Sequence, residues 1–174
     1  LSKFFTTIHT PIKATNIIVP YWSSPQTTQQ GGFPYMICHD QPPWYSLPNL
    51  EYPTLMKVLN HLGTDTNASE RHFDTDITTL ENIQEFLGQY VPSADGSEPK
   101  LREVCMYGCS GDNWPIVDFV PGEDGGVMVA YGGSGSGFKL GALFGKALSD
   151  GLEGEHGELA RGVFTLDRPG LKNQ

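Results

Sequence analysis

One glycine-rich stretch near the end of the chain carries residues that could bind an electron-rich ligand. Residues 132–139 read GGSGSGFK and follow the apolar run at residues 127–131. Glycine reaches the positive φ angles of a tight bend at low cost, and Ser134 and Ser136 are residue types that cap helices. A strand, a bend and a helix start aim backbone N–H groups and a positive dipole end at the bend. The spacing is not the GxGxxG dinucleotide fingerprint, and such turns also serve as plain connections.

A lysine and a histidine stand four residues apart in the strand-like run LMKVLNH at residues 55–61. Strand side chains repeat every second residue, so Lys57 and His61 are predicted to point to the same face. By pattern alone, such a lysine is often a solvated side chain whose stem covers apolar surface. Such a histidine is often only hydrogen-bonded. The pair is therefore a candidate for catalysis that needs a second argument.

Cys105 and Cys109 are the thiols with the clearest chemical potential. They could be two ligands of a zinc ion, but no second Cys or His pair stands at suitable spacing, so we expect no metal site. The plain alternative for Cys105 is a buried apolar thiol.

Three motifs have to be considered together: CMY at residues 105–107, the acidic turn SGD at residues 110–112, and GGSGSGFK. Together they resemble the C-terminal half of the monomeric sarcosine oxidase family of flavoproteins. The segments VPYW (residues 19–22) and YSLPNLEYPTLMKVLNHLG (residues 45–63) are most similar to the peroxisomal sarcosine and L-pipecolate oxidases of that family. The resemblance spans about residues 12–168.

The resemblance implies a role for each matched residue. Lys57 matches a lysine that promotes the reaction of reduced flavin with oxygen, where a fixed cation stabilises the developing negative charge. His61 matches a histidine of the substrate pocket, and Cys105 matches a cysteine joined to the flavin ring through a thioether. Lys139 matches a lysine that pairs with the substrate carboxylate.

Further site residues are implied in the same way. Tyr45 and Tyr107 would line the substrate side of the flavin, or they are simply core aromatics. The implied cofactor-binding residues are Cys105, Met106, Gly133, Ser134, Gly135, Ser136, Gly137, Phe138 and Lys139. The family commonly has phenylalanine and histidine where this chain has Gly133 and Ser136, which leaves the substrate range open.

The implied cofactor is FAD, and the implied reaction oxidises a secondary amino or imino acid to an imine and yields hydrogen peroxide. The expected partners are this small molecule, oxygen, and an N-terminal FAD-binding half on another segment or chain. Since that half is missing and the chain opens on Leu1, we expect a fragment or a processed piece. The alternative is a truncated, non-catalytic relative that serves as a structural or binding subunit.

The elements that must position these residues are mostly strands. Enrichment in β-formers between turn residues predicts strands at residues 12–22, 33–39, 44–47, 55–61 and 101–107. The polar residues 64–76 predict a connecting loop. Residues 127–131 are apolar on both faces, which predicts a strand that is covered on both sides.

Two helices are predicted. Thr78 followed by Glu81 fits a capping box, and an apolar stripe runs on to a stop before Pro92; its members are Leu80, Ile83, Phe86, Leu87 and Tyr90. A second helix is expected to start at residues 135–138, with small residues that let it lie close against a neighbour: Gly141, Ala142 and Gly145. The tail at residues 151–174 is predicted to be irregular, with residues 163–166 packing back as a short strand.

The predicted fold class is α+β. A mostly antiparallel substrate-domain sheet would be joined to the closing strand–helix unit of a doubly wound FAD-binding domain. We expect residues 1–107 to form the substrate-binding sheet region. Residues 108–174 would form the C-terminal part of the FAD-binding domain and a tail.

Charge and composition exclude several classes of partner. A net charge of −9 over 174 residues and a pI near 4.8 argue against nucleic acid and anionic membrane surfaces. No run reaches membrane-spanning length, and the N-terminus lacks a signal-peptide layout. Three cysteines do not make a disulfide framework, which favours an intracellular, reducing or organelle interior. A peroxisomal location follows only from the resemblance, because the last residues, KNQ, are no SKL-type address.

Overall fold

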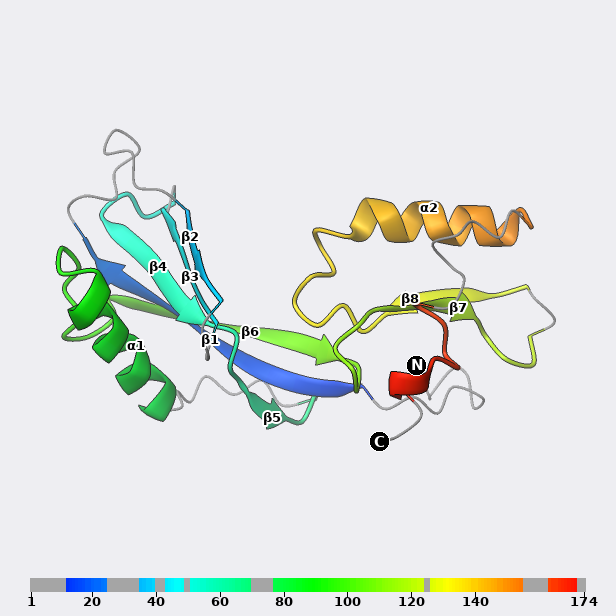
Figure 1. Ribbon diagram of the computed structural model, residues 1–174, viewed down its shortest axis with the longest axis horizontal. Helices are drawn as coiled ribbons and strands as arrows, with labels where there is room; N and C mark the ends of the chain where they lie inside the picture. The colour runs from blue at the N-terminus through cyan, green and yellow to red at the C-terminus, as the bar shows by residue number, and fades with distance from the viewer. Residues whose placement is uncertain are drawn as a thin grey trace. The chain divides into compact units, whose positions relative to one another are not determined.

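The computed structural model describes residues 12–24, 35–39, 43–48, 51–69, 77–123, 126–154 and 163–171. Its fold is α+β with mostly antiparallel strands and few helices, as predicted (Figure 1). The chain divides into two compact units. We call Asn16–Met106 the sheet unit, and Tyr107–Gln174 together with Leu1–Thr15 the hairpin unit. The predicted division of function at residue 107 stays a prediction.

The sheet unit is built on strands ordered β2-β3-β4-β1-β5, with β6 also paired to β1. The strands are β1 (Lys13–Ser23), β2 (Met36–Cys38), β3 (Trp44–Pro48), β4 (Leu55–Asn60), β5 (Thr64–Thr66) and β6 (Leu101–Cys109). All the predicted strands of this region are confirmed, except that residues 33–34 of the strand predicted at 33–39 lie outside the described residues. The short strand β5 was wrongly expected to be loop, because its residues TDT carry no apolar pattern and only its place beside β1 makes it a strand.

Helix α1 (Ile77–Tyr90) covers one face of this sheet (Figure 1). Trp44 of β3 stacks on Phe86 of α1 with ring centroids 4.7 Å apart. The predicted stripe is buried except at its end, where Tyr90 is 62% exposed. The helix already begins at Ile77, so Thr78 lies inside the first turn and the predicted capping box is wrong. We call the sheet face under α1, which carries Trp44, the helix face.

The hairpin unit contains the antiparallel pair β7 (Ile116–Phe119) and β8 (Met128–Tyr131), with α2 (Gly141–Leu152) packed against it (Figure 1). The helix lies close to β8 at Gly151, where an added Cβ would collide with Met128 Sδ. The predicted close-packing positions are wrong, because a Cβ at Gly141 or Gly145 would meet no described atom within 4 Å. Strand β8 is half-buried rather than covered on both sides, since α2 covers only one face of the pair.

Helix α2 starts later than predicted. Leu140 is its N-cap residue and no side chain caps it, so Ser134 and Ser136 do not have the predicted capping role. Instead, the Ser136 carbonyl accepts from the Leu140 N–H at 3.2 Å, and the Phe138 carbonyl accepts from the Gly141 N–H at 3.2 Å. The second of these bonds spans three residues instead of the four of an α-helix, so residues 137–140 form turns and the regular helix begins only at Gly141. Lys139 therefore lies before the helix and not in its first turn.

The tail packs back on β7 without forming the predicted strand. The Val117 N–H donates to the Phe164 carbonyl at 2.9 Å, and the Leu166 N–H donates to the Asp118 carboxylate at 2.8 Å. A short 3-10 helix, η2 (Pro169–Leu171), follows. Within the described ranges, no helix is long and apolar enough to cross a membrane.

Candidate functional site

In the sheet unit, the Lys57 ammonium contacts an aromatic ring of the neighbouring strand. It stands directly opposite Tyr21 in the antiparallel register of β4 and β1, so both side chains lie on the same sheet face. The Lys57 Nζ is 5.9 Å from the centroid of the Tyr21 ring, within the usual range of a cation–π contact. We call this face, opposite the helix face, the lysine face.

Tyr21 is itself fixed by two neighbours. Its O–H donates to Glu103 Oε2 of β6 at 2.7 Å, and Tyr52 meets its ring edge-on with centroids 5.3 Å apart. Burial, with the Glu103 hydrogen bond and charge, raises the pKa of the Tyr21 phenol well above its ordinary value. The phenol therefore stays neutral and keeps its proton on the Glu103 side.

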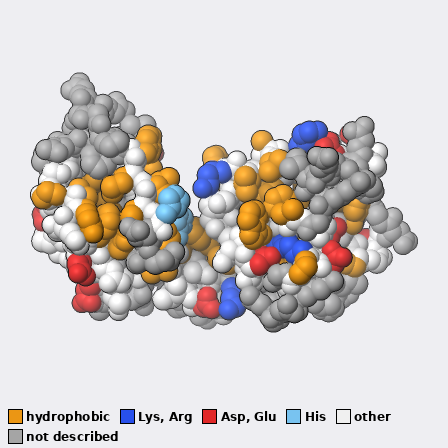
Figure 2. Space-filling view, viewed as in Figure 1, with side chains coloured by type: hydrophobic (Ala, Val, Ile, Leu, Met, Phe, Trp, Pro, Cys, Tyr) orange, Lys and Arg blue, Asp and Glu red, His pale blue; other side chains and the backbone are white. Residues whose placement is uncertain are grey.

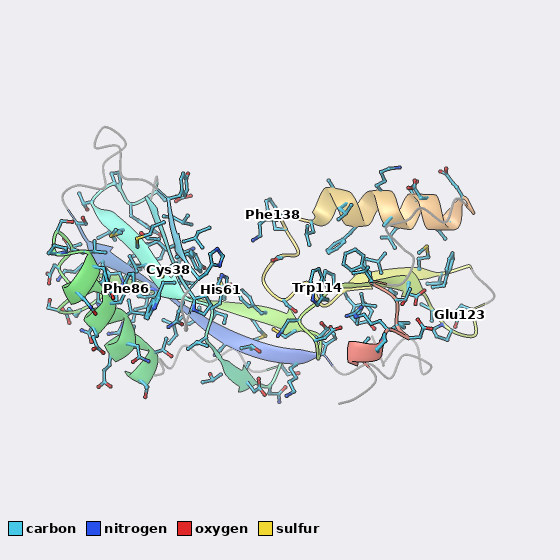
Figure 3. All side chains as sticks on the ribbon, in the orientation of Figure 1. Cys38, His61, Phe86, Trp114, Glu123 and Phe138 are labelled. Carbon is cyan, nitrogen blue, oxygen red and sulfur yellow. The ribbon has the colours of Figure 1, made fainter. Side chains whose placement is uncertain are left out.

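Tyr45 and His61 also come together on the lysine face. Their rings lie 4.7 Å apart and are tilted by 30°. In the register of β3 and β4, Leu47 lies opposite Lys57 and Tyr45 lies opposite Leu59. Because Tyr45 is two residues from Leu47, its side chain points to the same face as Lys57. His61 follows the end of β4 and is exposed (Figure 3). The predicted common direction of Lys57 and His61 agrees with this geometry.

Cys105 is an exposed free thiol on β6. The plain reading of a buried thiol is wrong. Because strand side chains alternate, Cys105 shares its face with Glu103, which bonds Tyr21. The thiol is thereby assigned to the lysine face, and its half-buried neighbour Met106 to the opposite one.

In the hairpin unit, the glycine-rich loop is tightly wound. Gly132 and Gly135 have φ of +69° and +85°, and even Ser134 is left-handed at +45°. A Cβ on Gly133 would lie 2.7 Å from Gly137 Cα, so this loop has no room for the phenylalanine that the resembling family commonly carries there. The departure from the family pattern at Gly133 is thus built into the backbone path.

The loop also presents backbone donors. The Ser134 N–H donates to the Gly108 carbonyl at 3.1 Å, and the Ser136 N–H donates to the Gly133 carbonyl at 2.7 Å. Among the described residues, no backbone acceptor is found for four further N–H groups, those of Gly135, Gly137, Phe138 and Lys139. Successive N–H groups in such a bend form a concavity for anionic or electron-rich atoms.

Three side chains belong to this loop or contact it. The half-buried Tyr107 ring lies under Gly135, where an added Cβ would be 2.7 Å from Tyr107 Cε2. Phe138 projects fully exposed from the loop before α2 (Figure 3). The next residue, Lys139, is exposed as well. Hydrophobic side chains also remain at the surface over this region (Figure 2). An aromatic ligand with electron-rich edge atoms suits such a surface.

The predicted site residues therefore form two sets. The sheet unit holds Tyr45, Lys57, His61, Cys105 and Met106. The hairpin unit holds Tyr107 and Gly133, Ser134, Gly135, Ser136, Gly137, Phe138 and Lys139. Sequence reasoning missed Tyr21 and Glu103. The one available signal for Glu103 is that it stands two residues before Cys105 in a predicted strand and so shares its face. No local pattern shows that Tyr21 stands opposite Lys57.

Three comparisons with known proteins bear on this arrangement. The family model described as FAD dependent oxidoreductase matches residues 2–151. A putative sarcosine oxidase of Caenorhabditis elegans is 28% identical over 97% of this chain and 46% of its own length, and the human peroxisomal sarcosine oxidase is 34% identical over 81% and 38%. The chain thus spans less than half the length of these relatives.

A solved structure, the deglycating enzyme fructosamine oxidase of Aspergillus fumigatus, resembles the chain with a TM-score of 0.74. The match covers 94% of this chain and 42% of the fructosamine oxidase chain. At 14% sequence identity, this similarity supports the fold alone. The family model, in contrast, matches most of the residues. The chain therefore belongs to the FAD-dependent oxidoreductase family.

Proposed function

We propose that this chain forms the substrate-facing and flavin-facing part of an oxidase for a secondary amino or imino acid of the sarcosine or pipecolate kind. Oxygen is the acceptor, and an imine and hydrogen peroxide are the products. The observation that carries the proposal is the lysine face, where Lys57 and Cys105 share one side of the sheet with the Tyr45–His61 pair. Relatives named sarcosine oxidase support this substrate class.

The residues present fit FAD. The loop N–H groups that have no backbone acceptor among the described residues suit electron-rich edge atoms of a flavin, and the glycines allow close backbone approach. The exposed Cys105 thiol and the Lys57 ammonium suit contact with the ring system. The chemistry that a bound FAD would supply is acceptance of a hydride equivalent from the carbon beside the substrate nitrogen and transfer of the electrons to oxygen.

Each side chain then has a separate task. In the hairpin unit, the exposed Lys139 ammonium suits the carboxylate of an amino or imino acid. In the sheet unit, the adjacent Tyr45 and His61 rings suit the orienting of a substrate. Lys57 provides a fixed positive charge that stabilises the negative charge developing on oxygen. No residue of the chain has to act as a strong base in this scheme.

We further propose that Cys105 is the covalent anchor of the flavin through a thioether and that the protein works in the peroxisome. Exposure of the thiol on the lysine face supports the first point. Relatives named peroxisomal sarcosine oxidase support the second. The ADP portion of FAD would be bound by an N-terminal half on another segment or chain.

The test is a visible absorption spectrum of the purified full-length protein, repeated on pellet and supernatant after acid precipitation. Flavin colour should stay in the pellet and fluoresce with the polypeptide on a denaturing gel. Cys105→Ser should release the colour into the supernatant, and the matched change Cys109→Ser should not. A protein that stays colourless with added FAD and consumes no oxygen with sarcosine or pipecolate would instead support a non-catalytic relative.

A further inference from the structure

We propose that Tyr21, fixed by Glu103, is the positioning residue that holds the Lys57 ammonium in place for its reaction partner. The role of the positioned ammonium in the reaction with oxygen rests on the proposed function. The contact between Tyr21 and Lys57 does not, because it involves only residues of the sheet unit.

The tyrosine ring is a rigid platform. Tyr21 is 6% exposed, its O–H donates to Glu103 at 2.7 Å, and Tyr52 packs against its ring edge-on. A lysine stem is flexible and costs conformational entropy to fix, so its ammonium needs a contact that defines where it sits. The Tyr21 face, directly opposite in the β1–β4 register, supplies that contact.

An aromatic face holds the cation without neutralising it. In the described part of the chain, Lys57 makes no ion pair with a carboxylate. The nearby carboxylate, Glu103, is occupied by the Tyr21 hydroxyl. A ring attracts an ammonium through its quadrupole and leaves its N–H donors free, whereas a carboxylate partner would cancel its charge. Donation from Tyr21 to a carboxylate also adds electron density to the ring and strengthens the attraction.

The first test is an NMR measurement on the purified chain with ¹³C-labelled lysine, in which Lys57→Met identifies the Lys57 signal. In the wild-type chain, the Lys57 Hε protons should be shifted upfield by the ring and show NOEs to Tyr21 ring protons. Tyr21→Phe should keep the shift and Tyr21→Leu should remove it. Tyr90→Leu, the same change at the exposed C-terminal end of α1, should leave it in place.

Since Tyr21→Leu could prevent folding, the wild-type NOE decides independently. A Lys57 signal without ring shift and without NOEs to Tyr21 overturns the inference. So does a folded Tyr21→Leu chain in which the Lys57 shift is unchanged.

The second test uses the flavin-loaded full-length protein and separates the half-reactions. Tyr21→Leu should slow reoxidation by oxygen and leave anaerobic reduction by substrate unchanged, and Tyr21→Phe should restore most of the oxygen rate. A Tyr21→Leu protein with the wild-type oxygen rate contradicts the positioning role. If Lys57→Met itself keeps the wild-type oxygen rate, the proposed role of Lys57 fails, while the NMR result still decides whether Tyr21 positions it.

Discussion

Arg168 and Asp112, 56 residues apart in the sequence, form a two-bond ion pair inside the hairpin unit. Arg168 Nε–H donates to Asp112 Oδ2 at 2.6 Å, and Nη2–H donates to Oδ1 at 2.7 Å. The other guanidinium N–H groups donate to the carbonyls of Trp114, Pro115 and Thr165. All five donors of the arginine are thereby used, and the tail is fixed to the turn that follows β6.

Removing the arginine should destabilise the hairpin unit strongly. Arg168→Leu leaves a largely buried carboxylate without its cation, which costs about 3–5 kcal/mol when a buried pair is broken. The matched control is Lys146→Leu, which breaks the exposed pair with Asp150 and should cost no more than about 0.5 kcal/mol. Urea unfolding followed by tryptophan fluorescence, through Trp114, measures both. Equal midpoints for the two variants would contradict the assignment.

The same pair should make stability depend on pH at the acid end. The Arg168 hydrogen bonds hold the pKa of Asp112 well below its usual range, so the unfolded chain takes up a proton there before the folded chain does. The stabilisation is fully present above the unfolded pKa of about 3.9 and is lost as pH falls toward the folded value. The midpoint of urea unfolding should therefore fall as the pH is lowered from about 6 to about 2.5. Asp112→Asn should be less stable than the wild-type chain at pH 6 and should lose less stability on acidification. An equal loss of stability in both proteins would argue against a role of Asp112.

Tyr21 should resist ionisation at alkaline pH. Burial and Glu103 raise its pKa, so the stabilisation is present below the unfolded value of about 10 and is lost as pH rises through the folded value. In an ultraviolet titration, Tyr21 should therefore ionise in a late phase, well above the unfolded value, and Tyr21→Phe should remove that late phase. Glu103→Gln should move the phase to lower pH, because the carboxylate charge contributes to the shift. A late phase that survives Tyr21→Phe would show that another tyrosine is responsible.

Two glycines of the hairpin unit should respond oppositely to alanine. At Gly135, φ is +85° and a Cβ would lie 2.7 Å from the Tyr107 ring, so Gly135→Ala should cost about 1–3 kcal/mol. At Gly145, in the interior of α2, a Cβ meets no described atom within 4 Å, so Gly145→Ala should stabilise by about 0.5–1 kcal/mol. Thermal unfolding of both variants checks the pair. A destabilised Gly145→Ala would mean that this helix face is packed against something.

The proposed function assigns Lys57 to one half-reaction only. Lys57→Met removes the fixed positive charge and should slow flavin reoxidation by oxygen on the order of 100-fold, with anaerobic reduction by substrate largely intact. Stopped-flow absorbance of the full-length protein measures the two steps separately. Equal loss in both would assign Lys57 to substrate binding or to folding instead.

Local pattern predicted most elements of the fold because it reflects local physics. Alternating β-formers in residues 55–61 predicted β4, and the apolar stripe ending before Pro92 predicted the C-terminal end of α1. Where packing or backbone pairing decides, the same reasoning failed. Strand β5 consists of polar residues, and α2 starts only at Gly141 because the residues before it form turns, in which the Phe138 carbonyl accepts from the Gly141 N–H.

The candidate site divides in the same way. The sequence alone determined that Lys57 and His61 share a direction, that residues 132–139 form a glycine bend, and that the chain resembles flavin oxidases. Only the tertiary structure placed Tyr21 opposite Lys57, Glu103 against Tyr21, and Arg168 on Asp112. These contacts depend on strand register and on segments far apart in the chain, and no local periodicity carries that information.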